Sequence, residues 1–242
     1  MYGRDAVADQ QRLNNLYENP LSLCLAGCKT SAKNGVIEKG WRLDLAARAK
    51  LPVPNGGILL DDFYQLAVLE EVVQFADGRL SIPSPQALSD LLYTAVRFPQ
   101  LDKPAILRPL YETAVPPQFS VNLADPPALA GALAELWAAL PAGAETGRDV
   151  LLQEMITIAV EGTAVTHSSR PTDTITCNSQ TSTLPQLGAW RRPDPAFPAH
   201  LRRLQLLLRG LRRTFGAGQW QVQWADDGRV CWLLSLKNIT IP

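Results

Sequence analysis

The sequence predicts an α+β fold in which the strands pair antiparallel and the helices pack on them. Between Lys39 and Lys50 the apolar residues recur at helical spacing. At the other end of the chain, Trp220–Ala225 and Val230–Leu236 flank the turn Asp226-Asp227-Gly228, a pattern typical of an antiparallel hairpin. Apolar residues make up 46% of the 242 residues, and this length allows one large domain or two small subdomains that share a core.

Prolines, glycines and acidic caps mark the elements of the first half of the chain. Pro52 and Pro54 end the first helix, and Asn55-Gly56-Gly57 is a turn. Asp61 can cap the helix that follows. The expected elements are a strand within Leu21–Gly27, a helix over Lys39–Lys50, a strand over Ile58–Leu60, a helix from Asp61 to about Phe75, a helix from about Pro85 to Arg97, and a strand over Ala105–Arg108.

The second half opens with a strand over Gln118–Leu123 and a helix that starts at Asp125-Pro126-Pro127. Two apolar runs, Val150–Met155 and Ala159–Thr166, are expected to form a pair of adjacent strands. Residues 167–199 are rich in Ser, Thr and Pro, and we expect an irregular connection there. A helix over Pro198–Phe215 then leads to the C-terminal hairpin.

Composition excludes several classes of protein. The formal net charge of +0 argues against a nucleic-acid partner, and there is no run of about 18 apolar residues that would insert into a membrane. The N-terminus lacks the order of a signal peptide, so we expect a cytoplasmic protein. No metal site is expected, because the four cysteines and two histidines do not form a known ligand pattern. Charged residues, at 19%, are sparse, which is typical of a surface partly covered by a protein partner.

Three segments of the chain carry a recognisable order of motifs. The first runs from Lys39-Gly40-Trp41 to Pro52-Val53-Pro54-Asn55-Gly56. The second begins with Val150-Leu151-Leu152-Gln153-Glu154-Met155 and continues to Thr166. The third is Gln221-Val222-Gln223-Trp224-Ala225 with the strand that follows it. In this order they resemble the ATP-grasp domain of the phosphoenolpyruvate synthase and pyruvate phosphate dikinase family, over roughly residues 36–242.

That resemblance implies an ATP-grasp-like fold of two subdomains, and it assigns positions to a nucleotide site. Lys39 stands where the family has its phosphate-binding lysine, and Arg108 falls on the arginine of a weaker strand match. Gln153 lies on the strand that lines the adenine side. Gln223 and Lys237 take the positions of the magnesium-side glutamate and the closing arginine. The cofactor-binding residues so implied are Lys39, Arg108, Gln153, Gln223 and Lys237, with ATP as the cofactor that the resemblance allows.

The departures from the family remove catalytic parts. The amide of Gln223 is neutral and a much weaker magnesium ligand than a carboxylate. Lys237 keeps a positive charge but lacks the planar fork with which arginine grips a phosphate. Ile37 and Glu38 replace the two glycines that would let backbone N–H groups approach a phosphate. No residue is therefore expected to be catalytic, and neither His167 nor His200 has the context of a phosphohistidine.

Each of these positions also has a structural interpretation. Lys39 can be a solvated residue at a helix start, Arg108 can pair with Glu112, and Gln153 can be packed in a strand. The arginines of the helix Leu201–Arg213 can form a solvated face or bind RNA or an acidic partner. Trp220, Trp224 and Trp232 are expected to pack across the C-terminal hairpin.

Two functions remain open. The first is a degenerate, non-catalytic binding or assembly subunit of a larger complex. The second is the nucleotide-binding subunit of an ATP-dependent phosphotransferase whose phosphohistidine domain lies on another chain.

The expected parts of the chain are a leader over 1–35, the first subdomain over 36–104, the nucleotide-cleft strands and helix over 105–166, the irregular connection over 167–199, and a helix and hairpin over 200–242.

Overall fold

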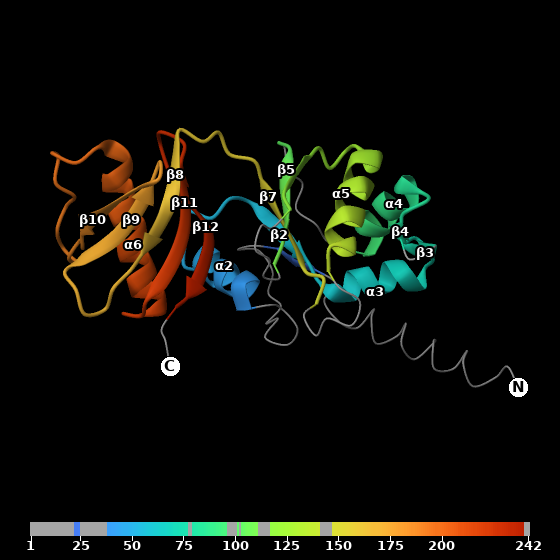
Figure 1. Ribbon diagram of the computed structural model, residues 1–242, viewed down its shortest axis with the longest axis horizontal. Helices are drawn as coiled ribbons and strands as arrows, with labels where there is room; N and C mark the ends of the chain where they lie inside the picture. The colour runs from blue at the N-terminus through green and yellow to red at the C-terminus, as the bar shows by residue number, and fades with distance from the viewer. Residues whose placement is uncertain are drawn as a thin grey trace, which may run out of the picture. The chain divides into compact units, whose positions relative to one another are not determined.

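The computed structural model describes residues 22–24, 38–76, 79–95, 101, 103–110, 117–140 and 147–239, without the side chains of 22–24, 38, 39 and 76. The chain divides into two compact units (Figure 1). Unit 1 consists of Met1–Gly40 and Asn55–Met155, and unit 2 of Trp41–Pro54 and Ile156–Pro242. Every strand pairing in the described part of the chain is antiparallel, and helices accompany the sheets. The predicted α+β class is confirmed.

Unit 1 contains a five-stranded sheet in the order β1-β2-β7-β5-β6. Its strands are β1 (Ser22–Cys24), β2 (Gly56–Leu59), β7 (Val150–Glu154), β5 (Ala105–Pro109) and β6 (Phe119–Val121). The remaining elements of the unit are helices α3 (Asp61–Leu69), α4 (Pro85–Ala95) and α5 (Pro126–Ala138) and the hairpin of β3 (Gln74–Ala76) and β4 (Arg79–Ser81).

The core of unit 1 lies between the sheet and its helices. Leu107 of β5 and Leu152 of β7 point into it and are fully buried. Phe63 and Tyr64 of α3 contact Trp137 of α5 with ring centroids 6.3 and 5.2 Å apart. Because side chains alternate along a strand, the residues next to these leucines point to the opposite face of the sheet.

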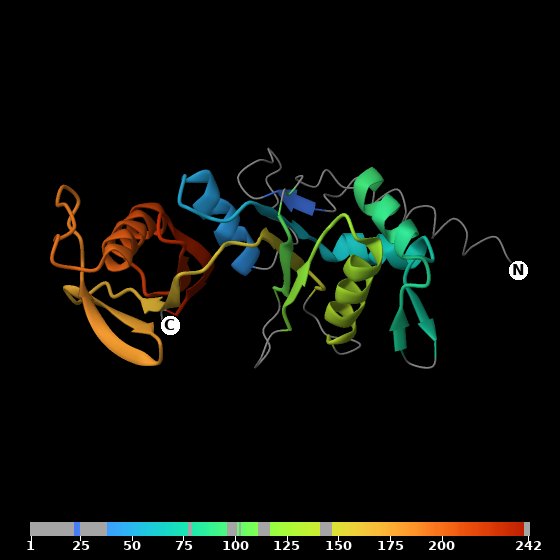
Figure 2. The ribbon, with the colours of Figure 1, turned by 90° about the horizontal axis from the view of Figure 1, so that it is seen from above.

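Unit 2 contains the second five-stranded sheet, in the order β10-β9-β8-β11-β12. Its strands are β8 (Val160–Val165), β9 (Thr172–Cys177), β10 (Gln180–Pro185), β11 (Trp220–Asp226) and β12 (Cys231–Asn238). Helix α6 (Ala199–Phe215) packs against the sheet (Figure 2). Its contact face is a stripe of buried leucines. That stripe consists of Leu204, Leu207, Leu208 and Leu211.

Neither unit is continuous in the sequence, because the chain enters unit 2 within the first helix and returns to unit 1 at Asn55. Helix α2 (Glu38–Arg48) and the chain to Pro54 belong for the most part to unit 2, together with the C-terminal hairpin. The Leu233 N–H of β12 donates to the Pro52 carbonyl at 2.7 Å, and the Arg42 guanidinium lies 5.2 Å from the Trp220 ring centroid. Such long-range contacts leave no trace in local periodicity.

The two strands expected to be adjacent lie in different sheets. β7 pairs with β2 and β5, whereas β8 pairs with β9 and β11. The helix expected from Asp61 to Phe75 ends at Leu69, and Phe75 lies in the short strand β3. Glu71 has a positive φ of 57°, which a continuing helix does not allow.

Residues 167–199 are not an irregular connection throughout. They contain β9 and β10, joined by Asn178 and Ser179 with φ values of 49° and 62°. Two successive positive φ values are those of the two-residue hairpin turn whose twist matches that of paired strands. Threonines, which are β-branched, supply the strand propensity here, and their polarity hid the pattern.

Asp61, which was expected to cap α3, lies inside that helix, and Leu60 stands at its N-cap. The start of α5 is confirmed where the sequence predicted it, and the helix is capped by Asp125. Its carboxylate accepts a hydrogen bond from the Ala128 N–H at 3.2 Å. The substitution Asp125→Ala is expected to lower the free energy of unfolding by about 1 kcal/mol, because this N–H loses its acceptor. Urea denaturation followed by circular dichroism measures the change. Glu135→Ala, at an exposed position of the same helix, is the matched control, and an equal loss in both variants would contradict the capping role.

Candidate functional site

Arg108 and Gln153 are brought together on unit 1. Arg108 lies on β5 and Gln153 on the neighbouring β7, where Gln153 pairs with Ile106. The Arg108 Nη2 donates to the Gln153 Oε1 at 2.5 Å. Burial lowers the pKa of Arg108 to about 10, so the guanidinium stays protonated at neutral pH. Gln153 is 4% exposed, and its Nε2 has no hydrogen-bond partner in the described part of the chain.

Strand alternation explains why these two polar side chains share a face. Ala105 and Leu107 of β5 are buried in the core with the helices, so Arg108 points to the opposite side of the sheet. The same argument applies to Gln153, which follows the core residue Leu152. This side of the sheet therefore holds a largely buried cation beside a buried amide donor without a described partner, and both groups suit an anionic ligand.

Gln223 and Lys237 lie on the same face of the unit 2 sheet, opposite the leucines of α6. Gln221 pairs with Lys237 and Gln223 pairs with Ser235, so all four side chains share one face. Gln221, Gln223 and Lys237 are exposed, whereas Val222 on the other face is fully buried. Threonine hydroxyls continue this face across the sheet. The register places Thr163, Thr174, Thr176, Thr181 and Thr183 there.

The five predicted ligand residues thus fall into two pairs, one on each unit, and one further residue. Lys39 lies in the first turn of α2, and its side chain is outside the described part of the structure. Glu112, the acid weighed as a partner for Arg108, also lies outside the described residues. Gln153 is packed in strand β7 and also accepts a hydrogen bond from Arg108.

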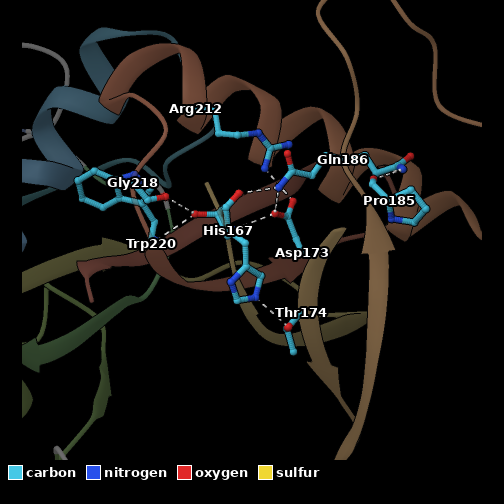
Figure 3. A network of polar contacts seen from close by, with 10 residues as sticks. His167, Asp173, Thr174, Pro185, Gln186, Arg212, Gly218 and Trp220 are labelled. Atoms are coloured by element: carbon cyan, nitrogen blue, oxygen red, sulfur yellow. Dashed lines mark hydrogen bonds and ion pairs between the residues drawn. The ribbon is translucent and has the colours of Figure 1, made fainter. Parts of the chain in front are cut away.

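A network of polar contacts centred on Asp173 of β9 was not predicted from the sequence (Figure 3). Asp173 is 1% exposed, and its Oδ2 accepts from the Arg212 Nη1 of α6 at 2.7 Å. Its Oδ1 accepts from the Gln186 Nε2 at 3.0 Å and from the His167 N–H at 3.3 Å. The His167 Nε2 lies 3.0 Å from the Thr174 Oγ1. The network ties β9, α6 and the chain around His167 together, so His167 has a structural position.

A second buried ion pair joins α6 to β11. The Arg203 Nε and Nη2 donate to the two carboxylate oxygens of Asp226, each at 2.7 Å, and Asp226 is 1% exposed. Hydrogen bonds from Arg203 hold the pKa of Asp226 below its ordinary value. Arg203 and Arg212 were interpreted as part of a solvated face, and this is wrong for both. Their acids lie far along the sequence, so no local spacing could have found the pairs.

The other sequence expectations concern packing and metals. Trp220 and Trp224 are buried, as expected, and Trp232 is half-buried with its Nε1 donating to the Asp227 Oδ2. Cys177 and Cys231 are free cysteines, and burial raises the pKa of Cys231 to about 12. Among the described residues, no three His, Cys, Asp or Glu side chains gather as metal ligands would. No described helix has both the length and the apolar character to cross a bilayer.

No protein-family model matches the sequence, and no curated protein matches it. Solved structures are similar in fold. An ATP-grasp RimK-domain protein from Sphaerobacter thermophilus is 18% identical, with 83% of this chain and 58% of that chain covered and a TM-score of 0.44. D-alanine–D-alanine ligase from Helicobacter pylori is 13% identical, with 83% and 54% covered and a TM-score of 0.49. The ATP-grasp ligase PsnB, complexed with precursor peptide PsnA2 and AMPPNP, is 12% identical, with 81% and 47% covered and a TM-score of 0.41.

The chain spans about half the length of these three structures. None of the three is a phosphoenolpyruvate synthase or a pyruvate phosphate dikinase, so that narrower resemblance stays a prediction. Identities this low concern the fold alone, and substrate and reaction have to be argued from the residues of this chain.

Proposed function

We propose that this chain is a degenerate ATP-grasp-like module that binds a nucleotide through its phosphates, does not transfer a phosphoryl group by itself, and acts as a binding or assembly subunit. The observation that carries the proposal is the Arg108–Gln153 pair on the face of the unit 1 sheet opposite its helices. A protonated arginine with a reduced pKa is a strong donor to phosphate. The unpartnered Gln153 Nε2 supplies a further donor.

The absence of catalysis is proposed from the residues on the unit 2 face. Phosphoryl transfer needs magnesium bridging the phosphates and carboxylates that hold it. At the position where the resemblance places that carboxylate, the exposed side chain is the amide of Gln223. Its neighbours by register, Ser235 and Thr163, offer hydroxyl groups. This arrangement favours contact with an anion over capture of a divalent cation.

Nucleotide binding is tested by isothermal titration of the full chain with ATP, with and without magnesium. We expect binding that changes little when magnesium is removed, because the proposed contacts are direct. The variant Arg108→Leu is expected to weaken binding by about tenfold or more, the value of a lost hydrogen bond from a charged group. Arg79→Leu, an exposed arginine of β4 in the same unit, is the control and should leave the affinity unchanged. Equal affinities for all three proteins would refute the proposed site.

Catalysis is tested separately. The purified chain is expected neither to hydrolyse ATP nor to form phosphoenolpyruvate from pyruvate. Turnover that depends on ATP and pyruvate in the wild-type protein would exclude the non-catalytic role. It would favour the alternative, a nucleotide-binding subunit of an ATP-dependent phosphotransferase whose phosphohistidine domain lies on another chain.

A further inference from the structure

The loop between β10 and α6 carries the most exposed large apolar side chain described. Trp190 is 96% exposed. It is followed by Arg191 and Arg192, which are also exposed. This loop projects from unit 2 beside α6 (Figure 2). Isolated apolar residues on a surface are ordinary, so exposure alone decides nothing. What sets Trp190 apart is how its loop is held and which charges surround it.

Two arginines of α6 fix the loop. The Arg209 Nη1 donates to the Arg191 carbonyl at 2.9 Å, and more weakly to the carbonyls of Gly188 and Ala189. The Arg213 Nη2 donates to the Ala189 carbonyl at 3.0 Å. The backbone of the loop is thus held on both sides of Trp190. A loop ordered before binding loses less entropy when a partner covers it.

The exposed side of α6 extends this surface. Leu206 is 42% exposed, and it lies three and seven positions before Arg209 and Arg213, on the same side of the helix. We define the Trp190 patch as Trp190, Arg191, Arg192, Leu206, Arg209 and Arg213. It has an aromatic residue and an aliphatic residue among arginines, which is the composition enriched at the centres of protein interfaces.

The charge around the patch is strongly one-sided. The overall formal charge is +0, yet residues 174–225 contain seven arginines and one carboxylate, Asp194. Arg203 and Arg212 are neutralised by the buried carboxylates of Asp226 and Asp173. The four arginines of the patch have no ion pair with a carboxylate within the described ranges. The field at this surface is therefore positive and selects an acidic partner.

We propose that the Trp190 patch is a docking surface for an acidic segment of a partner protein, in which an apolar side chain packs on Trp190 and carboxylates pair with the arginines. This inference rests on the proposed role of the chain as a binding or assembly subunit. Single-stranded nucleic acid fits less well, because its recognition uses successive aromatic platforms. Here the second apolar residue is Leu206, which offers no ring for a base to stack on.

The test is the binding of short labelled peptides to the full chain, followed by fluorescence anisotropy. The probe is a peptide of glutamate and leucine. A lysine–leucine peptide and oligouridylate of the same length are the comparisons. We expect the acidic peptide alone to bind, and to bind more weakly as salt rises. Trp190→Ala and Arg191→Glu/Arg192→Glu should each weaken it by about tenfold or more. Phe75→Ala, which removes an exposed aromatic side chain of β3 in unit 1, is the control and should leave peptide binding unchanged.

Three results would overturn the inference: no binding of the acidic peptide, equal binding by the variants, or preferential binding of the RNA. Because Trp190 is so exposed, its removal should leave the fold unchanged, which circular dichroism verifies. ATP titrations of the same variants separate the two proposals. If the patch variants keep their ATP affinity and no longer bind the peptide, both the ATP site and the docking surface are supported. If the acidic peptide does not bind the wild-type protein but Arg108→Leu still lowers the ATP affinity, only the docking surface is refuted.

Discussion

Replacing Asp226 by asparagine is expected to lower the free energy of unfolding by about 3–5 kcal/mol, the usual cost of removing one partner of a buried ion pair. Asp226 is 1% exposed and accepts two 2.7 Å hydrogen bonds from Arg203. Asparagine carries no charge, so the guanidinium would remain in its half-buried position without a counter-ion. Urea denaturation measures the loss, and amide hydrogen exchange should show it first in residues 156–239. Asp194→Asn, an exposed acid of the same unit, is the control.

The pH dependence follows from the same pair. Hydrogen bonds from Arg203 lower the pKa of Asp226 in the folded chain below the ordinary value of an aspartate. A carboxyl group with a lowered folded pKa stabilises the fold above its unfolded pKa, and this contribution disappears as pH falls through the folded value. The stability difference between wild type and Asp226→Asn should therefore be constant between about pH 5 and 8 and shrink below about pH 4. A constant difference down to pH 2 would contradict the role given to the ion pair.

Local signals in the sequence predicted the elements whose causes are local. The cap at Asp125, the leucine stripe of α6 and the C-terminal hairpin all follow from residues close together in the chain. The strand over Ala105–Arg108 was also predicted, whereas the alternation along it that puts Arg108 on the face opposite the core comes from the structure. The predicted elements are those that spacing and turn chemistry determine, and the α+β class follows from them.

The errors have nonlocal causes or unusual composition. β7 and β8 are consecutive in the chain yet lie in different sheets, because each pairs with strands distant in sequence. β9 and β10 were missed because threonine replaces the expected apolar residues and Asn178-Ser179 replaces an Asn-Gly turn. A short polar hairpin is easily taken for a loop when only hydrophobic alternation is counted.

The candidate site was predicted in part. The sequence resemblance selected Arg108 and Gln153 separately, and the structure adds the hydrogen bond between them. The sequence resemblance could not select Trp190, because a tryptophan in a proline-rich stretch carries no periodic signal of exposure or burial. The ion pairs of Arg203 and Arg212 also had no signal, because pairing across α6 and the sheet depends on the tertiary fold.

Gly56 lies where two strands of the unit 1 sheet approach each other closely. It pairs with Gln153 on β7, and a Cβ at this position would collide with the Leu152 carbonyl oxygen and lie 2.9 Å from the Gln153 Cα. Both obstacles are backbone atoms of a central strand, so they cannot turn aside as a flexible side chain would. Relief requires β2 to move away from β7, which weakens the ladder between them.

Gly56→Ala is therefore expected to lower the free energy of unfolding by about 1–3 kcal/mol, the range found when atoms are forced into a packed interior. Hydrogen exchange should accelerate in β2 and β7, and ATP affinity should fall because Gln153 lies at the disturbed pairing. Gly131→Ala is a control of opposite sign: nothing lies within 4 Å of a Cβ there, and alanine favours the helix α5 by up to about 1 kcal/mol. If Gly56→Ala proves as stable as wild type, the close approach of β2 and β7 does not exist in solution, and the position proposed for Gln153 beside Arg108 has to be abandoned with it.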